Sequence, residues 1–138
     1  MSDSLWILGV RLAGVFHFVT LVLACFTPIP PDWDKNLAGL PLIHRRFAVA
    51  QNFSIGAVIA VLGLFSLGFA PTLVAGAPLA RAVSGATALF RGGRLAVLPW
   101  LGARSTLSTP ALRLGYNLLL AECAIYASAY GWLALRPV

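Results

Sequence analysis

The chain has 138 residues, of which 59% are hydrophobic and 10% are charged, and its formal net charge is +6 at pH 7. Soluble domains carry about a quarter charged residues, so this composition argues against a soluble domain and favours an integral membrane protein. The basic residues stand singly between apolar runs, unlike the clustered patch of a nucleic-acid-binding protein. We therefore expect contacts with anionic lipid headgroups and no nucleic-acid partner.

Four apolar segments follow one another, and each is long enough to cross a bilayer, which takes about 20 residues. The first predicted helix ends at the segment TPIPPDWDKN, because its prolines cannot continue a helix. The fourth begins with a proline, which a helix start tolerates. The predicted helices cover about residues 5–26, 43–69, 79–101 and 110–135. We expect an all-α fold in which residues 1–138 form one domain, an up-down bundle of four transmembrane helices.

Positive charge is unequally divided between the two ends of this predicted bundle. The loops after the first and third helices share one end, which is the more basic. The opposite end has mainly Arg81 and Arg136, with Arg11 near it. The basic residues of those two loops are Lys35, Arg45, Arg46, Arg104 and Arg113. By the positive-inside rule these loops face the cytoplasm and both termini lie outside.

The segment ALFRGGRLAVLPW, residues 88–100, places two arginines inside the third predicted helix. A rise of about 1.5 Å per residue puts Arg91 roughly 15 Å and Glu122 roughly 18 Å from the ends of their helices. An isolated charge at that depth costs several kcal/mol, so we predict that Arg91 pairs with Glu122 across neighbouring helices. Arg94 lies closer to the interface and is able to extend toward headgroups.

Other polar side chains fall at a similar predicted depth. His17 lies about ten residues from the end of the first helix, and Tyr126 lies one turn beyond Glu122 on the same face. The predicted polar layer comprises His17, Gln51, Asn52, Arg91, Arg94, Glu122 and Tyr126. Such a layer more often fixes helix register through hydrogen bonds than performs chemistry, so the structural interpretation is favoured.

Small residues recur at near-helical spacing in the second and third predicted helices. The second helix carries a stripe of Asn52, Gly56, Ala60 and Gly63, and the third carries a shorter stripe of Gly85, Gly92 and Ala96. Small residues allow membrane helices to approach closely. The first stripe predicts that Asn52 faces into the bundle.

Histidine and cysteine offer little for a cofactor. Haem held by two histidines is not expected, because His44 lies at a loop boundary and does not match the depth of His17. Haem or a pigment held by His17 alone is the alternative left open. Cys25 and Cys123 have no metal-binding spacing and lie at different depths, so we predict neither a metal site nor a disulfide. No nucleophile, base and orienting group form a catalytic set. We therefore predict no cofactor and no enzymatic activity.

These observations favour a non-enzymatic protein that serves as an accessory or structural subunit of a larger membrane complex. Its expected partners are lipids and other membrane-protein subunits. The alternative is a small oligomeric transporter or proton-conducting protein that uses Arg91 and Glu122, since Glu122 is the only acid in the predicted spans.

The segments LIHRRFAVAQ, PLARAVSGATALFRGGRL and LRLGYNLLL resemble a group of small bacterial four-helix membrane proteins with no assigned function. The resemblance covers most of the chain from about Leu40 and implies a multi-pass protein of the bacterial inner membrane. In that group histidine often stands near the positions of Gln51 and Asn52, and again at that of Asn117. This chain departs from the group there, which puts any metal or haem role of the group in doubt for it.

Overall fold

The computed structural model describes residues 3–26 and 32–137, and helices account for most of them. The helices are α1 (Asp3–Phe26), α2 (Trp33–Ala38), α3 (Leu42–Gly68), α4 (Ala70–Ala75), α5 (Pro78–Trp100), the 3-10 helix η1 (Ala103–Thr106) and α6 (Pro110–Leu135). These two ranges contain no strand, so the all-α prediction is confirmed for them. The prolines expected to end the first helix, within residues 27–31, lie outside the described residues.

The four long helices α1, α3, α5 and α6 begin and end within two residues of the predicted boundaries. Three of them, α1, α3 and α6, are long and apolar enough to cross a membrane, which suggests a membrane protein. α5 is nearly as long but carries Arg81, Arg91 and Arg94, and it is not among these three. Arginine is among the least favourable residues at the centre of a membrane helix. Taken by itself, α5 is therefore not apolar enough to be counted as a membrane span.

Proline, threonine and glycine set the ends of several helices. Pro78 and Pro110 occupy the first turns of α5 and α6, where a backbone N–H has no partner within the helix. Thr109 Oγ1 caps α6 by accepting a hydrogen bond of 3.2 Å from Leu112 N. Gly76 adopts a φ of 75°, a left-handed conformation that lets the chain turn from α4 into α5.

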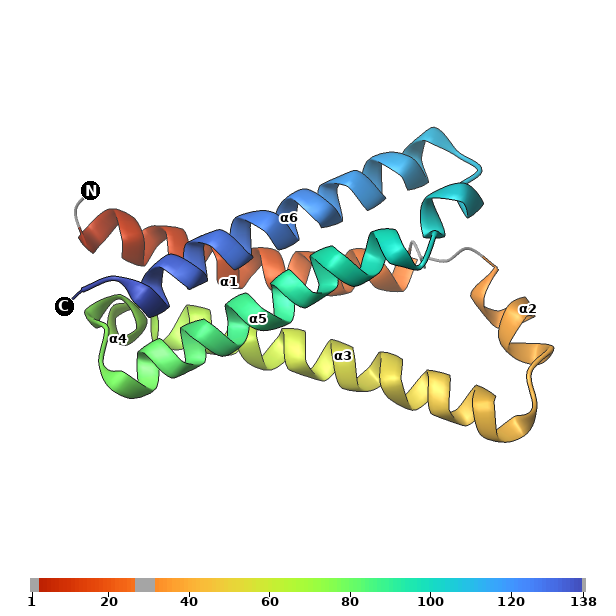
Figure 1. The fold of residues 1–138 in the computed structure, drawn as a ribbon, viewed down its shortest axis with the longest axis horizontal. Helices are drawn as coiled ribbons and strands as arrows, with labels where there is room; N and C mark the ends of the chain where they lie inside the picture. The colour runs from red at the N-terminus through yellow and green to blue at the C-terminus, as the bar shows by residue number, and fades with distance from the viewer. Residues whose placement is uncertain (1–2, 27–31, 138) are drawn as a thin grey trace.

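Two helix pairs form the body of the protein, α1 with α3 and α5 with α6 (Figure 1). The short helix α4 contacts α1, α3 and α5, and it joins the pairs at the end where both termini lie. α2 lies at the other end of the molecule. Figure 1 also shows that α3 and α5 diverge toward the end that carries α2.

Two glycines allow α1 and α3 to touch. A Cβ added at Gly14 would lie 2.8 Å from Leu67 Cγ, and one added at Gly63 would lie 2.9 Å from Phe18 Cε2 and 3.0 Å from His17 Cβ. The distances of 2.8 and 2.9 Å are too short for a real Cβ, so the backbones approach as closely as glycine permits. The predicted stripe on the second helix therefore lies at a helix contact at Gly63.

The α5 and α6 helices also meet along small residues, but less tightly. A Cβ at Gly85 would lie 3.8 Å from Ala134 Cβ, and one at Gly92 would lie 3.9 Å from Ala127 Cβ. These are ordinary van der Waals distances. Ala96 is exposed, so the predicted stripe of the third helix does not extend to it.

The apolar core lies at the end that carries the termini. α4, which the sequence did not predict, supplies Ala70, Leu73 and Val74, none of which is more than 3% exposed. The other members of the core are Val10, Ala80, Tyr126, Tyr130 and Leu133. A six-residue helix gains its stability from such contacts, so no local pattern could have predicted it.

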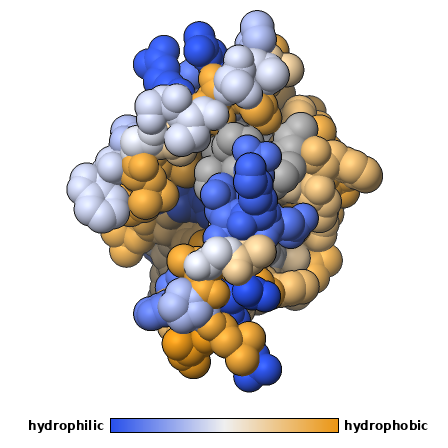
Figure 2. All heavy atoms as spheres, turned by 90° about the vertical axis from the view of Figure 1, so that its right-hand side faces the viewer, coloured by the Kyte–Doolittle hydropathy of each residue, from blue (hydrophilic) through white to orange (hydrophobic). Residues whose placement is uncertain are grey.

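Apolar side chains cover the outer surfaces of the long helices, and polar residues gather at the ends. Phe53 of α3 and Leu89 of α5, for example, are 77% and 80% exposed. Figure 2 shows the end that carries α2 and η1, where hydrophilic side chains form patches flanked by apolar ones. The charged residues of this end are Asp32, Asp34, Lys35, Arg45, Arg46, Arg104 and Arg113.

Candidate functional site

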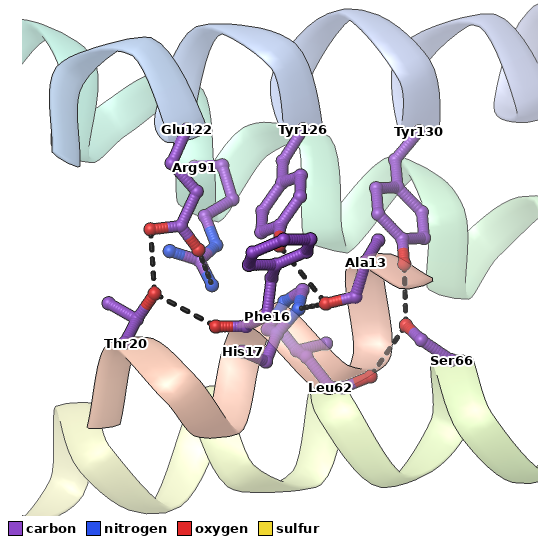
Figure 3. A network of polar contacts seen from close by, with 10 residues as sticks. All are labelled: Ala13, Phe16, His17, Thr20, Leu62, Ser66, Arg91, Glu122, Tyr126 and Tyr130. Carbon is purple, nitrogen blue, oxygen red and sulfur yellow. Dashed lines mark hydrogen bonds and ion pairs between the residues drawn. The ribbon is translucent and has the colours of Figure 1, made fainter. Parts of the chain in front are cut away.

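The structure places Arg91 of α5 beside Glu122 of α6. Arg91 Nη2 lies 3.7 Å from Glu122 Oε1, and the side chains of Arg91 and Glu122 are 0% and 17% exposed. Figure 3 shows both side chains directed toward α1. The predicted ion pair is therefore present, although its two atoms are too far apart for a hydrogen bond.

Thr20 of α1 binds the second carboxylate oxygen. Its hydroxyl lies 2.8 Å from Glu122 Oε2 and 2.9 Å from the carbonyl oxygen of Phe16, so its single proton serves one of these acceptors at a time. When Glu122 is ionised, the charged acceptor is the stronger one. The sequence analysis missed Thr20, since a threonine in an apolar helix commonly bonds its own backbone.

His17 and Tyr126 form a stacked pair between α1 and α6. Their ring centroids are 4.6 Å apart and their planes are 6° from parallel. His17 Nδ1 donates to the carbonyl oxygen of Ala13 at 2.7 Å, and the Tyr126 hydroxyl donates to the same oxygen at 3.0 Å. Arg91 Cζ lies 4.8 Å from the centroid of the Tyr126 ring, a cation–π distance. We call His17, Thr20, Arg91, Glu122 and Tyr126 the polar cluster.

A further contact joins α3 to α6 one turn away from the polar cluster. The Tyr130 hydroxyl donates to Ser66 Oγ, because the Ser66 hydroxyl itself donates to the carbonyl oxygen of Leu62 at 2.8 Å. The Tyr130 ring meets the Tyr126 ring edge-on, with centroids 6.2 Å apart. Ser66 and Tyr130 lie one turn or more beyond the predicted polar layer, so the sequence analysis did not include them.

The prediction that Asn52 faces the bundle is wrong, and Gln51 is likewise exposed. The reason is the register between α1 and α3. Gly63 lies opposite His17, whereas Asn52 lies 11 residues earlier in α3, about 16 Å along the helix axis. Counting depth from the loop misplaced both amides, because the first turns of α3 extend past the end of α1.

Arg94 lies next to the polar cluster, and its side chain is only partly exposed. It is within electrostatic range of Arg91, Glu122 and Cys123, and its Nε is buried. The buried Nε places this partly exposed side chain at the edge of the polar cluster. Cys123 is buried beside it, whereas Cys25 is exposed and also a free thiol, as the difference in predicted depth suggested.

Several buried polar atoms of this region have no hydrogen-bond partner among the described residues. Native proteins satisfy the great majority of such atoms, so each one that is left over needs an explanation. The atoms are His17 Nε2, Ser84 Oγ, Arg91 Nε, Nη1 and Nη2, Arg94 Nε and Glu122 Oε1.

His17 was the one candidate ligand for haem or a pigment. Its Nδ1 is bound to Ala13, Tyr126 covers one face of the ring, and the side chain is 0% exposed. Nε2 is the nitrogen left for a ligand, but it is enclosed in the bundle. In the described part of the chain no three histidine, cysteine or acidic side chains are grouped to hold a metal ion.

Two open hollows lie elsewhere on the surface. One, of about 580 Å³, is lined by residues 75–78 and Arg81 near the start of α5. The other, of about 490 Å³, is an apolar groove between α1 and α3. Neither is lined by a residue of the polar cluster.

Comparison with known proteins gives no relative from which a role could be transferred: no protein-family model, curated protein or solved structure matches the chain.

Proposed function

We propose that the chain is a non-enzymatic integral membrane protein with four transmembrane helices, which serves as an accessory or structural subunit of a larger membrane complex. The observation that carries the proposal is that polar side chains inside the protein link its two helix pairs. The ring contacts and hydrogen bonds of His17, Thr20, Tyr126 and Tyr130 connect the α1/α3 pair to the α5/α6 pair. Polar side chains are used in this way where membrane helices need a fixed register.

The proposal takes α5 as the fourth span despite its arginines. Arg91 is fully buried and Arg94 is held against α6, so neither charge stands free on the outside of the helix. Exposed residues of α5 such as Leu89 and Val97 are apolar and suited to lipid. α5 would then enter the membrane together with α6, since burial of its charges depends on that partner.

The hydrogen bonds of the polar cluster support a structural role over proton transfer. His17 and Tyr126 both donate to the carbonyl oxygen of Ala13, and Ser66 donates to that of Leu62. A backbone carbonyl accepts a hydrogen bond but has no proton to pass on, so each of these bonds ends there.

The charges at the two ends favour an inner-membrane protein with both termini outside. The end that carries α2 and η1 has five basic residues against Asp32 and Asp34, whereas the other end has Arg81 and Arg136 against Asp3. Exposed Lys35, Arg46 and Arg104 are placed to meet anionic headgroups there. The bacterial origin rests on the resemblance alone.

Extraction from native membranes in a mild detergent tests the proposal. We expect the protein to migrate with larger membrane proteins at a fixed stoichiometry, measured by size separation, mass spectrometry and an absorbance spectrum of the same peak. Migration alone as a small homo-oligomer would contradict the subunit role.

A small oligomeric transporter or proton-conducting protein is the second candidate. Glu122 Oε1 and His17 Nε2 favour it, because neither atom accepts a hydrogen bond from the described residues and both are able to bind a proton. Purified protein in liposomes with a pH-sensitive dye inside distinguishes the two. Proton flux that Glu122→Gln removes would support the second candidate, and no flux above that of empty liposomes would support the first.

A further inference from the structure

The charges buried around α5 and α6 do not balance. Two guanidinium groups, those of Arg91 and Arg94, face a single carboxylate, that of Glu122. His17 donates from Nδ1 and is neutral when Nε2 keeps its lone pair, so it contributes no negative charge. Two positive charges against one negative charge leave one uncompensated positive charge beside the fully buried Arg91, at the partly exposed edge of the cluster.

The hydrogen-bonding capacity of Arg91 is also unused. Its side chain is 0% exposed, and Nε, Nη1 and Nη2 all lack a hydrogen-bond partner among the described residues. Tyr126 meets the guanidinium at cation–π distance. That contact engages the face of the group, whereas its five N–H donors lie in its plane. Glu122 Oε1 lies 3.7 Å from Nη2 and the Cys123 thiol lies nearby, but neither accepts a hydrogen bond of ordinary geometry. Arg94 Nε adds another unpartnered donor at the same place.

We propose that a small monovalent anion of the size of chloride binds between Arg91 and Arg94. Such an ion supplies the missing negative charge and accepts N–H bonds from both guanidinium groups. Glu122 stays paired with Arg91 and Thr20, so the site carries two positive and two negative charges once the anion is bound.

The burial of Arg91 decides the size of the ligand. A lipid phosphate or the carboxylate of a partner subunit would approach from outside the bundle, where Arg91 exposes no surface. A single ion is small enough to be enclosed beside the buried guanidinium of Arg91, and Arg94 next to it is partly exposed. Water satisfies donors but leaves the extra positive charge uncompensated.

Thermal unfolding of the purified protein in a non-ionic detergent tests the site. Sodium chloride replaces sodium gluconate at constant ionic strength, so that screening stays unchanged and gluconate, a bulky anion, serves as the reference. We expect the Tm to rise with chloride and to saturate. At a hundredfold excess over the dissociation constant the rise should be about 5–10 °C. Equal Tm values in the two salts would overturn the proposal and leave water as the ligand.

Arg94→Gln is the test variant and Arg104→Gln the matched control. Arg94 lies at the edge of the cluster, so its amide variant should fold, whereas Arg104 is exposed in η1 and away from the cluster. The chloride-dependent rise in Tm should disappear in Arg94→Gln and persist in Arg104→Gln. A rise of equal size in both variants would mean a general salt effect and would overturn the proposal.

Two further measurements keep the inference open to refutation if Arg94→Gln fails to fold. Bound chloride in exchange with free chloride should broaden the chloride NMR line of the unaltered protein, and excess bromide should remove the broadening by competition. No broadening would refute the site. A Tm that rises with added phosphatidylglycerol and not with chloride would also refute it, and would assign Arg94 to a lipid headgroup.

Discussion

The rings of His17 and Tyr126 lie almost parallel, 4.6 Å apart, and both side chains donate a hydrogen bond to the carbonyl oxygen of Ala13. One backbone oxygen of α1 is thereby tied to its own helix and to α6. Since α1 packs mainly on α3, this contact is among the few that hold the two helix pairs together.

The stacking of the His17 ring on Tyr126 should contribute more to the stability of the protein than the hydrogen bonding of its imidazole nitrogens. His17→Phe keeps a ring against Tyr126 and removes the unpartnered Nε2, so we expect a loss of no more than about 1 kcal/mol in the free energy of unfolding. His17→Ala leaves a cavity and should cost about 2–4 kcal/mol. Reversible unfolding in mixed detergent micelles measures both. Equal losses would show that the Nδ1 hydrogen bond dominates.

Neither of these His17 variants should change the visible absorbance of the purified protein. His17 is enclosed, and one face of its ring is covered by Tyr126, which leaves little space for haem beside Nε2. Spectra of the unaltered protein and of His17→Ala, extracted from the same host under the same conditions, provide the comparison. A Soret band present only in the unaltered protein would refute this prediction and restore the haem alternative.

The Arg91 and Glu122 pair should behave as a unit. Arg91→Ala leaves the largely buried Glu122 with one hydrogen-bond partner and no counter-charge at Oε1, and we expect a loss of about 3–5 kcal/mol in the free energy of unfolding. The double variant Arg91→Ala with Glu122→Ala should be less harmful than the sum of the single variants by about 1–3 kcal/mol. A double-mutant cycle measured by unfolding gives this coupling energy. Additive losses would exclude an interaction between the two side chains.

Thr20 should act through its hydroxyl. Thr20→Val has nearly the same shape but cannot donate to Glu122 Oε2, so it should cost about 1–3 kcal/mol. Thr20→Ser keeps the donor and serves as the control, with a smaller loss. Unfolding measurements compare the two losses in stability. A larger loss for Thr20→Ser than for Thr20→Val would mean that the methyl group of Thr20, and not its hydrogen bond, is needed for packing against α6.

The contact between α1 and α3 should be sensitive to a single methyl group. Gly14→Ala would place a Cβ 2.8 Å from Leu67 Cγ and 3.0 Å from the carbonyl oxygen of Gly63, so the helices must separate, at a cost of about 1–3 kcal/mol. Gly9→Ala in the same helix meets nothing within 4 Å and should be neutral or stabilising by up to about 1 kcal/mol. Thermal unfolding of the two variants compares them directly, and equal Tm values would argue against close contact at Gly14.

The sequence by itself determined the helices and the need for a charge pair. Long apolar runs bounded by proline give helices with ends that local chemistry sets, so the boundaries of the four long helices could be predicted. Arg91 and Glu122 fall at similar depth in neighbouring helices, and because a lone buried charge is so costly, their pairing followed as well.

Only the tertiary structure decided which polar residues join that pair. Counting from helix ends assumes that neighbouring helices begin at the same level, whereas close contact at Gly14 and Gly63 shifts α3 along α1. That shift removes Asn52 from the layer, whereas the packing of α1 against α6 brings Thr20 to Glu122. The buried helix α4 is likewise a product of its neighbours, because six residues do not form a stable helix without contacts on several sides.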